Sequence, residues 1–273
     1  MYNSEIFQAL ILGVVQGASE VLPISSSGHL ILIPNILGWD GLVNSLAFDV
    51  ALHLGTTLAV VAFFWKDWTT LLTSFAKTLP KGFKAVWQEP NSRLLIFLAV
   101  GSVPAALVGL ILEKEIEESF RSNLLIAFDL IIFALVLYVV DRVSKKRRGE
   151  TKINLFDSLF IGSAQALALL PWVSRSGITI SAGLSRDLNR EAATRFSFLL
   201  STPAILGAAL LKLTDMSDNF ADNKGVFTVG LLAAAISGWL AIKILLSYVK
   251  SNNFNIFVIY RIVLGVSILL FLL

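Results

Sequence analysis

The sequence predicts an all-α polytopic integral membrane protein. We expect two inverted-topology repeats, each with a re-entrant helical hairpin plus about three transmembrane helices. Three observations support this prediction. The chain of 273 residues is 56% hydrophobic and 15% charged, with a mean hydropathy of +0.77, which is too apolar for a soluble domain of this length. A polar motif near the N-terminus returns in the second half, and basic and acidic residues are concentrated in different loops.

The re-entrant hairpins are predicted where apolar stretches are short and are interrupted by polar residues. Residues 6–37 contain two such stretches joined by serines and a glycine, and residues 155–184 have the same layout. A membrane-crossing helix needs about 20 apolar residues, and irregular backbone at membrane depth must be buried in protein or line a cavity. We therefore expect each segment to enter and leave the membrane on one side.

Longer apolar windows predict the full spans. They lie near residues 47–65, 94–112 and 124–140, and near residues 193–213, 226–249 and 254–273. Residues 66–93 carry lysines among aromatic residues and are expected to form an amphipathic helix at the membrane surface. We treat residues 1–273 as a single membrane domain. Its parts are a first repeat at 1–140, a basic cytoplasmic linker at 141–154 and a second repeat at 155–273.

Loop charge predicts the orientation of the chain. Lysine and arginine are concentrated in residues 66–93 and 141–154, whereas residues 113–123 and 214–225 are net acidic. Basic loops normally stay in the cytoplasm. Three expected spans separate the two hairpins, so the second copy is inverted and the hairpins should meet near the midplane. These loops also explain the net charge of +3, and we expect no nucleic-acid partner.

The repeated motif carries the polar residues that apolar membrane helices normally lack. The first copy, residues 16–29, reads QGASEVLPISSSGH, and the second, residues 165–179, reads QALALLPWVSRSGIT. Residues shared by the copies are Gly13, Gln16, Ser25, Ser27 and Gly28, which return as Gly162, Gln165, Ser174, Ser176 and Gly177. Glu20 and His29 belong to the first copy alone, and Arg175 belongs to the second alone. We therefore expect one site formed between the two halves.

Glu20 and Arg175 are the strongest candidates for function. Gln16 and Glu20 are four residues apart, on one face of a helix. Burying an ionisable group in a membrane is costly, so Glu20 is a functional candidate, with packing between helices as the alternative. Arg175 needs an anion, and its guanidinium suits a phosphate held by two hydrogen bonds. A structural ion pair with Glu20 is the alternative for Arg175.

The serine turns are candidates for anion binding. The first is formed by Ser25, Ser26, Ser27 and Gly28, and the second by Ser174, Arg175, Ser176 and Gly177. Each precedes an expected helix, where hydroxyl caps and free backbone N–H groups can hold an anion. Ordinary helix capping is the alternative for these serines. His29 closes the first turn and suits proton transfer or nucleophilic attack, whereas His53 is expected to be structural.

Three motifs give the chain its resemblance to a known family. The chain resembles the bacterial undecaprenyl-diphosphate phosphatases that confer bacitracin resistance, over nearly its whole length. The family's (E/Q)xxxE motif is present as Gln16 and Glu20, its SS(S/T)GH turn as Ser25 to His29, and its PGxSRSxxT motif as Pro171 to Thr179. One departure is Trp172, which stands where the family usually has glycine.

The resemblance implies a multi-pass hydrolase of the bacterial cell (inner) membrane. It would convert undecaprenyl diphosphate, a long-chain polyprenyl diphosphate lipid, to undecaprenyl phosphate and inorganic phosphate. This recycles the lipid carrier for peptidoglycan synthesis. The family also implies a divalent cation, Mg²⁺ or Ca²⁺, and a site that opens to the periplasm. A homodimer is left open.

Phosphoryl transfer depends on positioning and charge neutralisation, which suggests roles for the matched residues. Arg175, Ser174, Thr179 and backbone N–H groups would hold the diphosphate, and Glu20 with Gln16 would hold the metal. Ser26 would attack phosphorus while His29 takes its proton. Direct attack by His29, or by a water that His29 activates, is equally open.

Two other functions are weighed against this one. Inverted repeats with broken helices are also typical of transporters, so a transporter or flippase of a lipid phosphate or small anion is the main alternative. A hydroxyl, an imidazole and a carboxylate in one motif favour cleavage over passage. A second class of membrane phosphatase has its nucleophilic histidine six residues after a Ser-Arg pair. That position holds Ser181 after Arg175 and Ala192 after Arg186, so we exclude this class.

Overall fold

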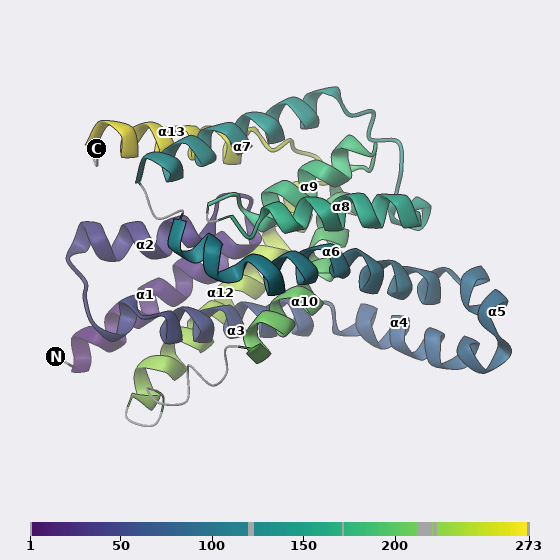
Figure 1. Cartoon of the computed structure of the whole chain (residues 1–273), viewed down its shortest axis with the longest axis horizontal. Coiled ribbons are helices and arrows are strands. Elements are labelled where there is room, and N and C mark those ends of the chain that lie inside the picture. Colours follow the sequence, from purple (N-terminus) through teal and green to yellow (C-terminus); the bar gives the residue numbers. More distant parts are fainter. Residues whose placement is uncertain (1, 120–122, 171, 212–219, 221–222, 272–273) are drawn as a thin grey trace.

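The computed structural model describes residues 2–119, 123–170, 172–211, 220 and 223–271. Within these residues the secondary structure is helical, apart from an isolated bridge between Arg148 and Leu188. Figure 1 shows long helices that run roughly along the longest axis of the molecule, with two shorter helical hairpins between them. The all-α fold class expected from the sequence is therefore observed.

The helices follow one another in the same order in the two halves, except for an insertion in the first. The first half contains α1 (Tyr2–Val21), α2 (Ser26–Leu37), α3 (Leu46–Phe63), α4 (Trp65–Thr78), α5 (Phe83–Gln88), α6 (Pro90–Ser119) and α7 (Asn123–Val143). The second half contains α8 (Leu155–Leu167), α9 (Arg175–Ser185), α10 (Arg190–Leu211), α12 (Lys224–Tyr248) and α13 (Asn255–Phe271). Single 3₁₀ turns form η1 (Leu42–Asn44), η2 (Leu79–Lys81) and η3 (Glu150–Lys152).

Four helices among the described residues are long and apolar enough to cross a membrane. They are Leu46–Phe63, Pro90–Ile111, Leu124–Val143 and Lys224–Tyr248. Large hydrophobic side chains on them are exposed, such as Leu110 and Ile236, as expected where a helix faces lipid. The chain is therefore a polytopic α-helical membrane protein. The other two expected spans correspond to α10 and α13, which are not among these four, and α13 has 17 residues.

The two short hairpins enter the helix bundle from opposite ends. In Figure 1, α1 runs inward from the end that holds the N-terminus and α2 returns to that end, whereas α8 and α9 do the same from the other end. Their tips are in direct contact, because Arg175 of α9 donates to Glu20 of α1 and the Ser176 hydroxyl donates to the Leu22 carbonyl. The polar motif of each half thus lies at the tip of a hairpin inside the bundle.

Equivalent helices of the two halves pack against the other half in the same way. Helix α1 of the first half packs on α12 of the second, and α8 of the second half packs on α6 of the first. Equivalent glycines permit both approaches: a Cβ atom on Gly13 would lie 2.4 Å from the Gly230 carbonyl oxygen, and one on Gly162 would lie 1.9 Å from that of Gly101. Small residues at such crossings are typical of membrane helices. The two halves therefore interlock rather than form separate bodies.

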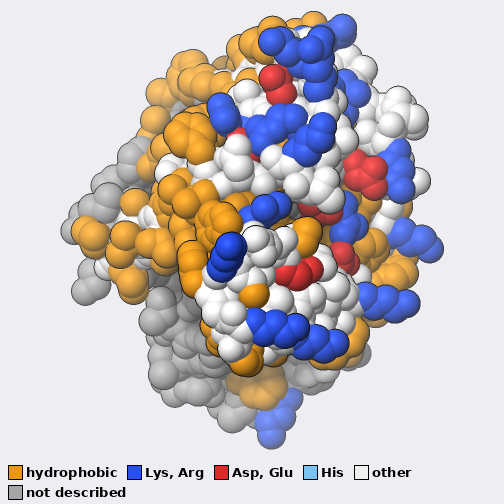
Figure 2. Space-filling model, turned by 90° about the vertical axis from the view of Figure 1, so that its right-hand side faces the viewer, with side chains coloured by type: hydrophobic (Ala, Val, Ile, Leu, Met, Phe, Trp, Pro, Cys, Tyr) orange, Lys and Arg blue, Asp and Glu red, His pale blue; other side chains and the backbone are white. Residues whose placement is uncertain are grey.

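One end of the molecule is strongly basic. Figure 2 shows lysine and arginine side chains gathered on the face at the α4 and α5 end. The expected single amphipathic helix at residues 66–93 is broken there into α4, η2 and α5, because Pro80 and Gly82 (φ +92°) interrupt it. The loops at residues 113–123 and 214–225 were expected to be acidic and to face away from the cytoplasm. Their acidic side chains lie outside the described residues.

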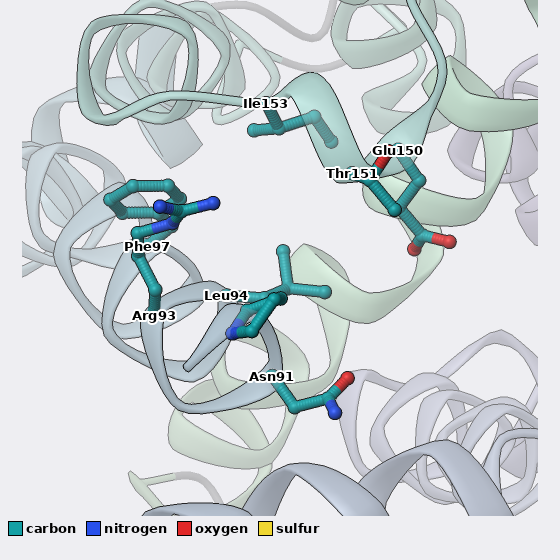
Figure 3. A pocket seen from close by; sticks show the side chains of 8 residues that line it. Asn91, Arg93, Leu94, Phe97, Glu150, Thr151 and Ile153 are labelled. Carbon is teal, nitrogen blue, oxygen red and sulfur yellow. The ribbon is translucent and has the colours of Figure 1, made fainter. Parts of the chain in front are cut away.

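A small cavity also lies at this basic end. Figure 3 shows Arg93 and Phe97 of α6 on one side of it and Glu150 and Thr151 of η3 on the other. Its volume is about 90 Å³. The candidate site at the hairpin tips is recognised from its side chains.

Candidate active site

The turns before α2 and α9 share an unusual backbone conformation. Ser25 has φ 75° and ψ 97°, and Ser174, its counterpart in the second motif, has φ 67° and ψ 103°. Residues other than glycine rarely adopt positive φ, and such strain is concentrated at functional sites. The helices begin directly after these serines, so their first N–H groups lie at the hairpin tips without helical partners. Each turn is therefore built to present backbone donors.

Glu20 joins the two halves at the centre of the site. It is 8% exposed, and its Oε1 accepts a 2.8 Å hydrogen bond from Nη2 of Arg175. Its Oε2 accepts from the Ser26 hydroxyl at 2.5 Å and from Nε2 of Gln16 at 3.3 Å. The ring of His53 also approaches Oε2, at 3.7 Å. The site thus contains the ion pair that was the structural alternative for Arg175, and it holds Ser26 beside that pair.

Several buried polar atoms around the tips have no hydrogen-bond partner among the described residues. They are Nε and Nη1 of Arg175, Oε1 of Gln16, both amide atoms of Gln165, and Nη1 of Arg261. A buried group without a partner costs about 1–3 kcal/mol, so these atoms are free to bond to water or to a ligand at the tips. Because Arg175 uses one nitrogen for Glu20 and keeps two unpartnered, it can still grip a second anion.

His29 is held apart from Ser26. Its Nδ1 lies 2.6 Å from the Ser25 carbonyl oxygen, and its Nε2 lies 2.6 Å from the Tyr260 hydroxyl. The Ser26 hydroxyl bonds to Glu20 instead. The expected transfer of the Ser26 proton to His29 therefore does not match these contacts. Glu20 is the group that accepts the hydrogen bond of Ser26, because its carboxylate on α1 reaches the first turn of α2.

The remaining serines of the motifs form matched pairs. The hydroxyls of Ser25 and Ser27 are 3.4 Å apart, as are those of Ser174 and Ser176. Ser174 also caps α9 by accepting from the Gly177 N–H at 3.3 Å, whereas Ser25 has no such side-chain bond. Helix capping, the simpler role considered for these serines, is therefore present in the second turn.

Thr179 has a supporting position rather than a direct one. Its hydroxyl bonds to the Arg175 carbonyl at 2.7 Å and to the Ser197 hydroxyl of α10 at 2.6 Å, and its side chain is fully buried. These bonds hold the first turn of α9, which carries Arg175, against α10. The structure thus does not place the Thr179 hydroxyl among the unpartnered groups at the tips.

Trp172 occupies the position of the family's usual glycine. Its φ is +83°, which is the region that favours glycine. The indole is 1% exposed and packs with Leu32 and Leu130, and a Cβ atom on Gly28 would lie 3.3 Å from its ring. The indole therefore packs behind the first turn, and the backbone keeps the path that glycine would take. Pro171, which precedes it in the motif, lies outside the described residues.

Sequence reasoning missed two residues of α13. Tyr260 contacts His29, and Arg261 is fully buried, donating to the carbonyls of Leu130 (3.2 Å) and Val173 (3.5 Å). A signal for Arg261 was available, because an arginine within an apolar membrane segment marks a polar interior. Tyr260 had no such signal, since a tyrosine in a membrane helix is usually unremarkable in function.

The described residues offer few ligands for a metal. They contain no group of three or more His, Cys, Asp and Glu side chains arranged to hold one. Glu20 and Gln16 nevertheless place a carboxylate and an unpartnered amide oxygen side by side. Mg²⁺ is often bound by one or two carboxylates together with phosphate oxygens and water, so this pair fits a cation shared with a phosphate ligand.

Comparison with known proteins identifies the family. The family model described as Bacitracin resistance protein BacA matches residues 9–267. A protein of Moorella thermoacetica named undecaprenyl-diphosphatase is 47% identical over 263 residues, covering 96% of each chain. A protein of Pelotomaculum thermopropionicum with the same name is 43% identical over 264 residues, covering 97% of this chain and 96% of the relative. The chain belongs to the BacA family of bacitracin resistance proteins.

Proposed function

We propose that this chain hydrolyses undecaprenyl diphosphate to undecaprenyl phosphate and inorganic phosphate. One observation carries the proposal: a serine hydroxyl bonded to a buried carboxylate, beside a guanidinium with two unpartnered nitrogens. This combination supplies a nucleophile, a proton acceptor and an anion-binding group. The names of the relatives supply the substrate. The reaction would return the lipid carrier to cell-wall synthesis and give bacitracin resistance.

Each side chain then has a role in phosphoryl transfer. Nε and Nη1 of Arg175 bind the diphosphate, helped by the free N–H groups at the starts of α2 and α9. The Ser26 oxygen forms a bond to the terminal phosphorus while the bond from that phosphorus to the bridging oxygen breaks, and the lipid phosphate leaves. The Ser26 proton passes to Glu20. Water then hydrolyses the phosphoserine, releasing phosphate and restoring the hydroxyl.

A divalent cation, Mg²⁺ or Ca²⁺, would be held by Glu20 and by Oε1 of Gln16. When bound, it neutralises charge on the phosphate oxygens during transfer. The amide oxygen is available because it has no partner among the described residues, and a carboxylate has lone pairs beyond those used by Arg175 and Ser26. Metal dependence of phosphate release after chelation tests this assignment directly.

The membrane arrangement proposed is a pair of inverted-topology repeats whose re-entrant hairpins meet in the bilayer of the bacterial inner membrane. Support comes from the opposite entry of the hairpins in Figure 1 and from the repeated packing of α1 on α12 and α8 on α6. The basic end in Figure 2 faces the cytoplasm by the positive-inside bias. The site opens to the periplasm, and the polyprenyl tail stays in lipid.

Cysteine labelling tests the orientation, because the chain has no cysteine of its own. Cysteine at exposed Asp40, between α2 and α3, should react with a membrane-impermeant maleimide in intact cells. Cysteine at exposed Arg147, beside the basic end, should react only after lysis. The opposite pattern would reverse the proposed topology.

Phosphate release in detergent separates a phosphatase from a transporter, since no second compartment exists. The purified chain should release phosphate from undecaprenyl diphosphate and form a phosphorylated intermediate that rapid denaturation at neutral pH traps. Mass spectrometry of the peptide that contains Ser26 and His29 would locate the phosphate. Phosphate on His29 would overturn Ser26 as the nucleophile, and no release at all would favour the transporter.

A further inference from the structure

The contact between His29 and Tyr260 joins the first hairpin to the last helix of the second half. His29 lies in the first turns of α2, and Tyr260 lies on α13, near the end of the chain. Besides the 2.6 Å hydrogen bond, the two rings are stacked, with 5.7 Å between their centroids and 10° between their planes. His29 is 9% exposed, whereas Tyr260 is 43% exposed. The phenol is therefore the accessible partner of a buried imidazole.

The two hydrogen bonds of His29 determine which ring nitrogen carries the proton. A carbonyl oxygen can only accept, so Nδ1 must donate to the Ser25 carbonyl. In the neutral ring Nε2 is then the acceptor, and the Tyr260 hydroxyl donates to it. The carbonyl belongs to a residue at φ 75°, so the strained turn and the phenol together fix the ring.

Tyr260 is itself held in place by its neighbour in the chain. Arg261 is fully buried and donates from Nε to the Leu130 carbonyl and from Nη2 to the carbonyls of Asp129 and Val173. These bonds tie α13 to α7 and to the turn before α9. Rotation of α13 would break them, so the position of the phenol opposite His29 is defined by a buried anchor.

We propose that Tyr260 is a positioning residue for His29 in the phosphatase reaction, an inference that rests on the proposed function. Its hydroxyl bonds to Nε2 and so holds the neutral imidazole in the tautomer protonated at Nδ1, with Nε2 as the basic nitrogen. In the second step of the proposed reaction, this nitrogen takes the proton of the water that hydrolyses the phosphoserine, while Glu20 serves Ser26 in the first step. If Tyr260 only filled space, its ring would matter and its hydroxyl would not.

Substitution separates the hydroxyl from the ring. Tyr260→Phe keeps the stacked ring and should lower kcat about 10- to 100-fold with little change in KM, as expected for impaired acid–base catalysis. Tyr260→Gln retains an N–H donor and should recover part of the loss. Tyr138→Phe is the matched control, since Tyr138 of α7 is similarly exposed, at 39%, and should keep the full rate.

Nitrogen NMR of the histidine rings gives a readout that packing alone would not move. The chain has two histidines, so histidine labelled with ¹⁵N gives signals from His29 and His53, and a spectrum of His53→Gln assigns them. In the unmodified chain, His29 should show the neutral tautomer protonated at Nδ1. Tyr260→Phe should shift the Nε2 resonance of His29 or mix the tautomers, whereas Tyr138→Phe should change neither.

The outcomes separate this inference from the function on which it rests. Absence of phosphate release by the unmodified chain would refute the proposed function, while the spectra would still test the pairing. An active chain in which Tyr260→Phe keeps its kcat, or keeps the His29 spectrum, would overturn the positioning role. Gel filtration and thermal melting of each variant show whether it is folded. If Tyr260→Phe is unfolded, a different tautomer of His29 in the unmodified chain would overturn the proposal.

Discussion

The turn before α2 and the turn before α9 have nearly the same backbone but carry different chemistry. Ser25 and Ser174 differ by 8° in φ (75° and 67°) and by 6° in ψ (97° and 103°). The first hairpin has Glu20, Ser26 and His29 where the second has Leu169, Arg175 and Ile178. Neither hairpin alone combines a nucleophile with a cation. The scaffold is therefore duplicated, while the reactive groups are divided between the copies.

Contacts across the tips show why the division matters. Arg175 and Ser176 of the second hairpin bond to Glu20 and to the Leu22 carbonyl of the first. Because the two tips are in contact, a residue change in one copy creates a pair rather than two like charges. Two arginines, or two glutamates, at this distance would repel each other in a medium of low dielectric constant.

The largest effect is expected from removing the cation of the second turn. Arg175→Ala should lower the rate of phosphate release by a factor of roughly 10³ or more, as for other arginines that neutralise phosphoryl transfer. Arg175→Lys should recover little, because an ammonium group lacks the bidentate fork. Arg147→Ala, at an exposed position of the basic linker, is the control and should be fully active. A near-native rate for Arg175→Ala would place the site elsewhere.

Making the first hairpin resemble the second should also abolish most activity. Glu20→Leu copies Leu169 and removes the proton acceptor, and Glu20→Gln removes only the charge. Either change should cost about 10²- to 10³-fold in kcat, within the range of general-base contributions. Excess Mg²⁺ should not restore Glu20→Gln, because more metal cannot replace the lost proton acceptor. Initial rates of phosphate release across a Mg²⁺ titration provide the measurement, and full rescue would contradict a role as base.

Trp172 tests whether the second turn needs its unusual side chain. Trp172→Gly should keep the rate of phosphate release within about tenfold of the native rate, or about 1.4 kcal/mol, because the indole packs behind Gly28. Stability should fall by about 3–5 kcal/mol for the lost buried ring, less the relief of positive φ at a residue other than glycine. A rate loss of several orders of magnitude in folded protein would show that the indole shapes the site.

The smallest effects are expected for Ser27 and Ser176, which occupy equivalent positions in the two turns. Ser176→Ala removes the 3.1 Å bond to the Leu22 carbonyl and should reduce stability by about 1 kcal/mol. Ser27→Ala should cost less, because the Ser27 hydroxyl bonds within its own turn. Thermal unfolding in the same detergent compares the pair. An equal loss for both variants would mean that the bond across the tips adds nothing.

Much of the fold could be predicted because the sequence repeats itself. Gly13 and Gly162, and the serine turns that follow them, marked two equivalent hairpins, and the structure places both pairs in equivalent settings. The prediction of a single amphipathic helix at residues 66–93 was wrong, since Pro80 and Gly82 divide this segment. Both residues were visible in the sequence, but lysine and aromatic patterning hid their effect.

The site could be predicted in part for a physical reason. Ionisable residues are rare in apolar membrane helices, and for this reason Glu20 and Arg175 stand out in the sequence. Which group a hydroxyl bonds to depends on differences in position of about an ångström. The sequence therefore did not reveal that Ser26 bonds to Glu20 and His29 to Tyr260. Tyr260 lies far from the motifs in the chain and looks ordinary there.

One measurement tests most directly whether the two halves form a single site. A double-mutant cycle compares phosphate release by Glu20→Gln, Arg175→Ala and the double variant, all shown to be folded. If the two groups act together on one phosphate, the double variant should be no more than a fewfold slower than the slower single variant, so the losses fail to multiply by at least tenfold, or about 1.4 kcal/mol. Losses that multiply fully would mean that Glu20 and Arg175 act independently, and would contradict a shared site.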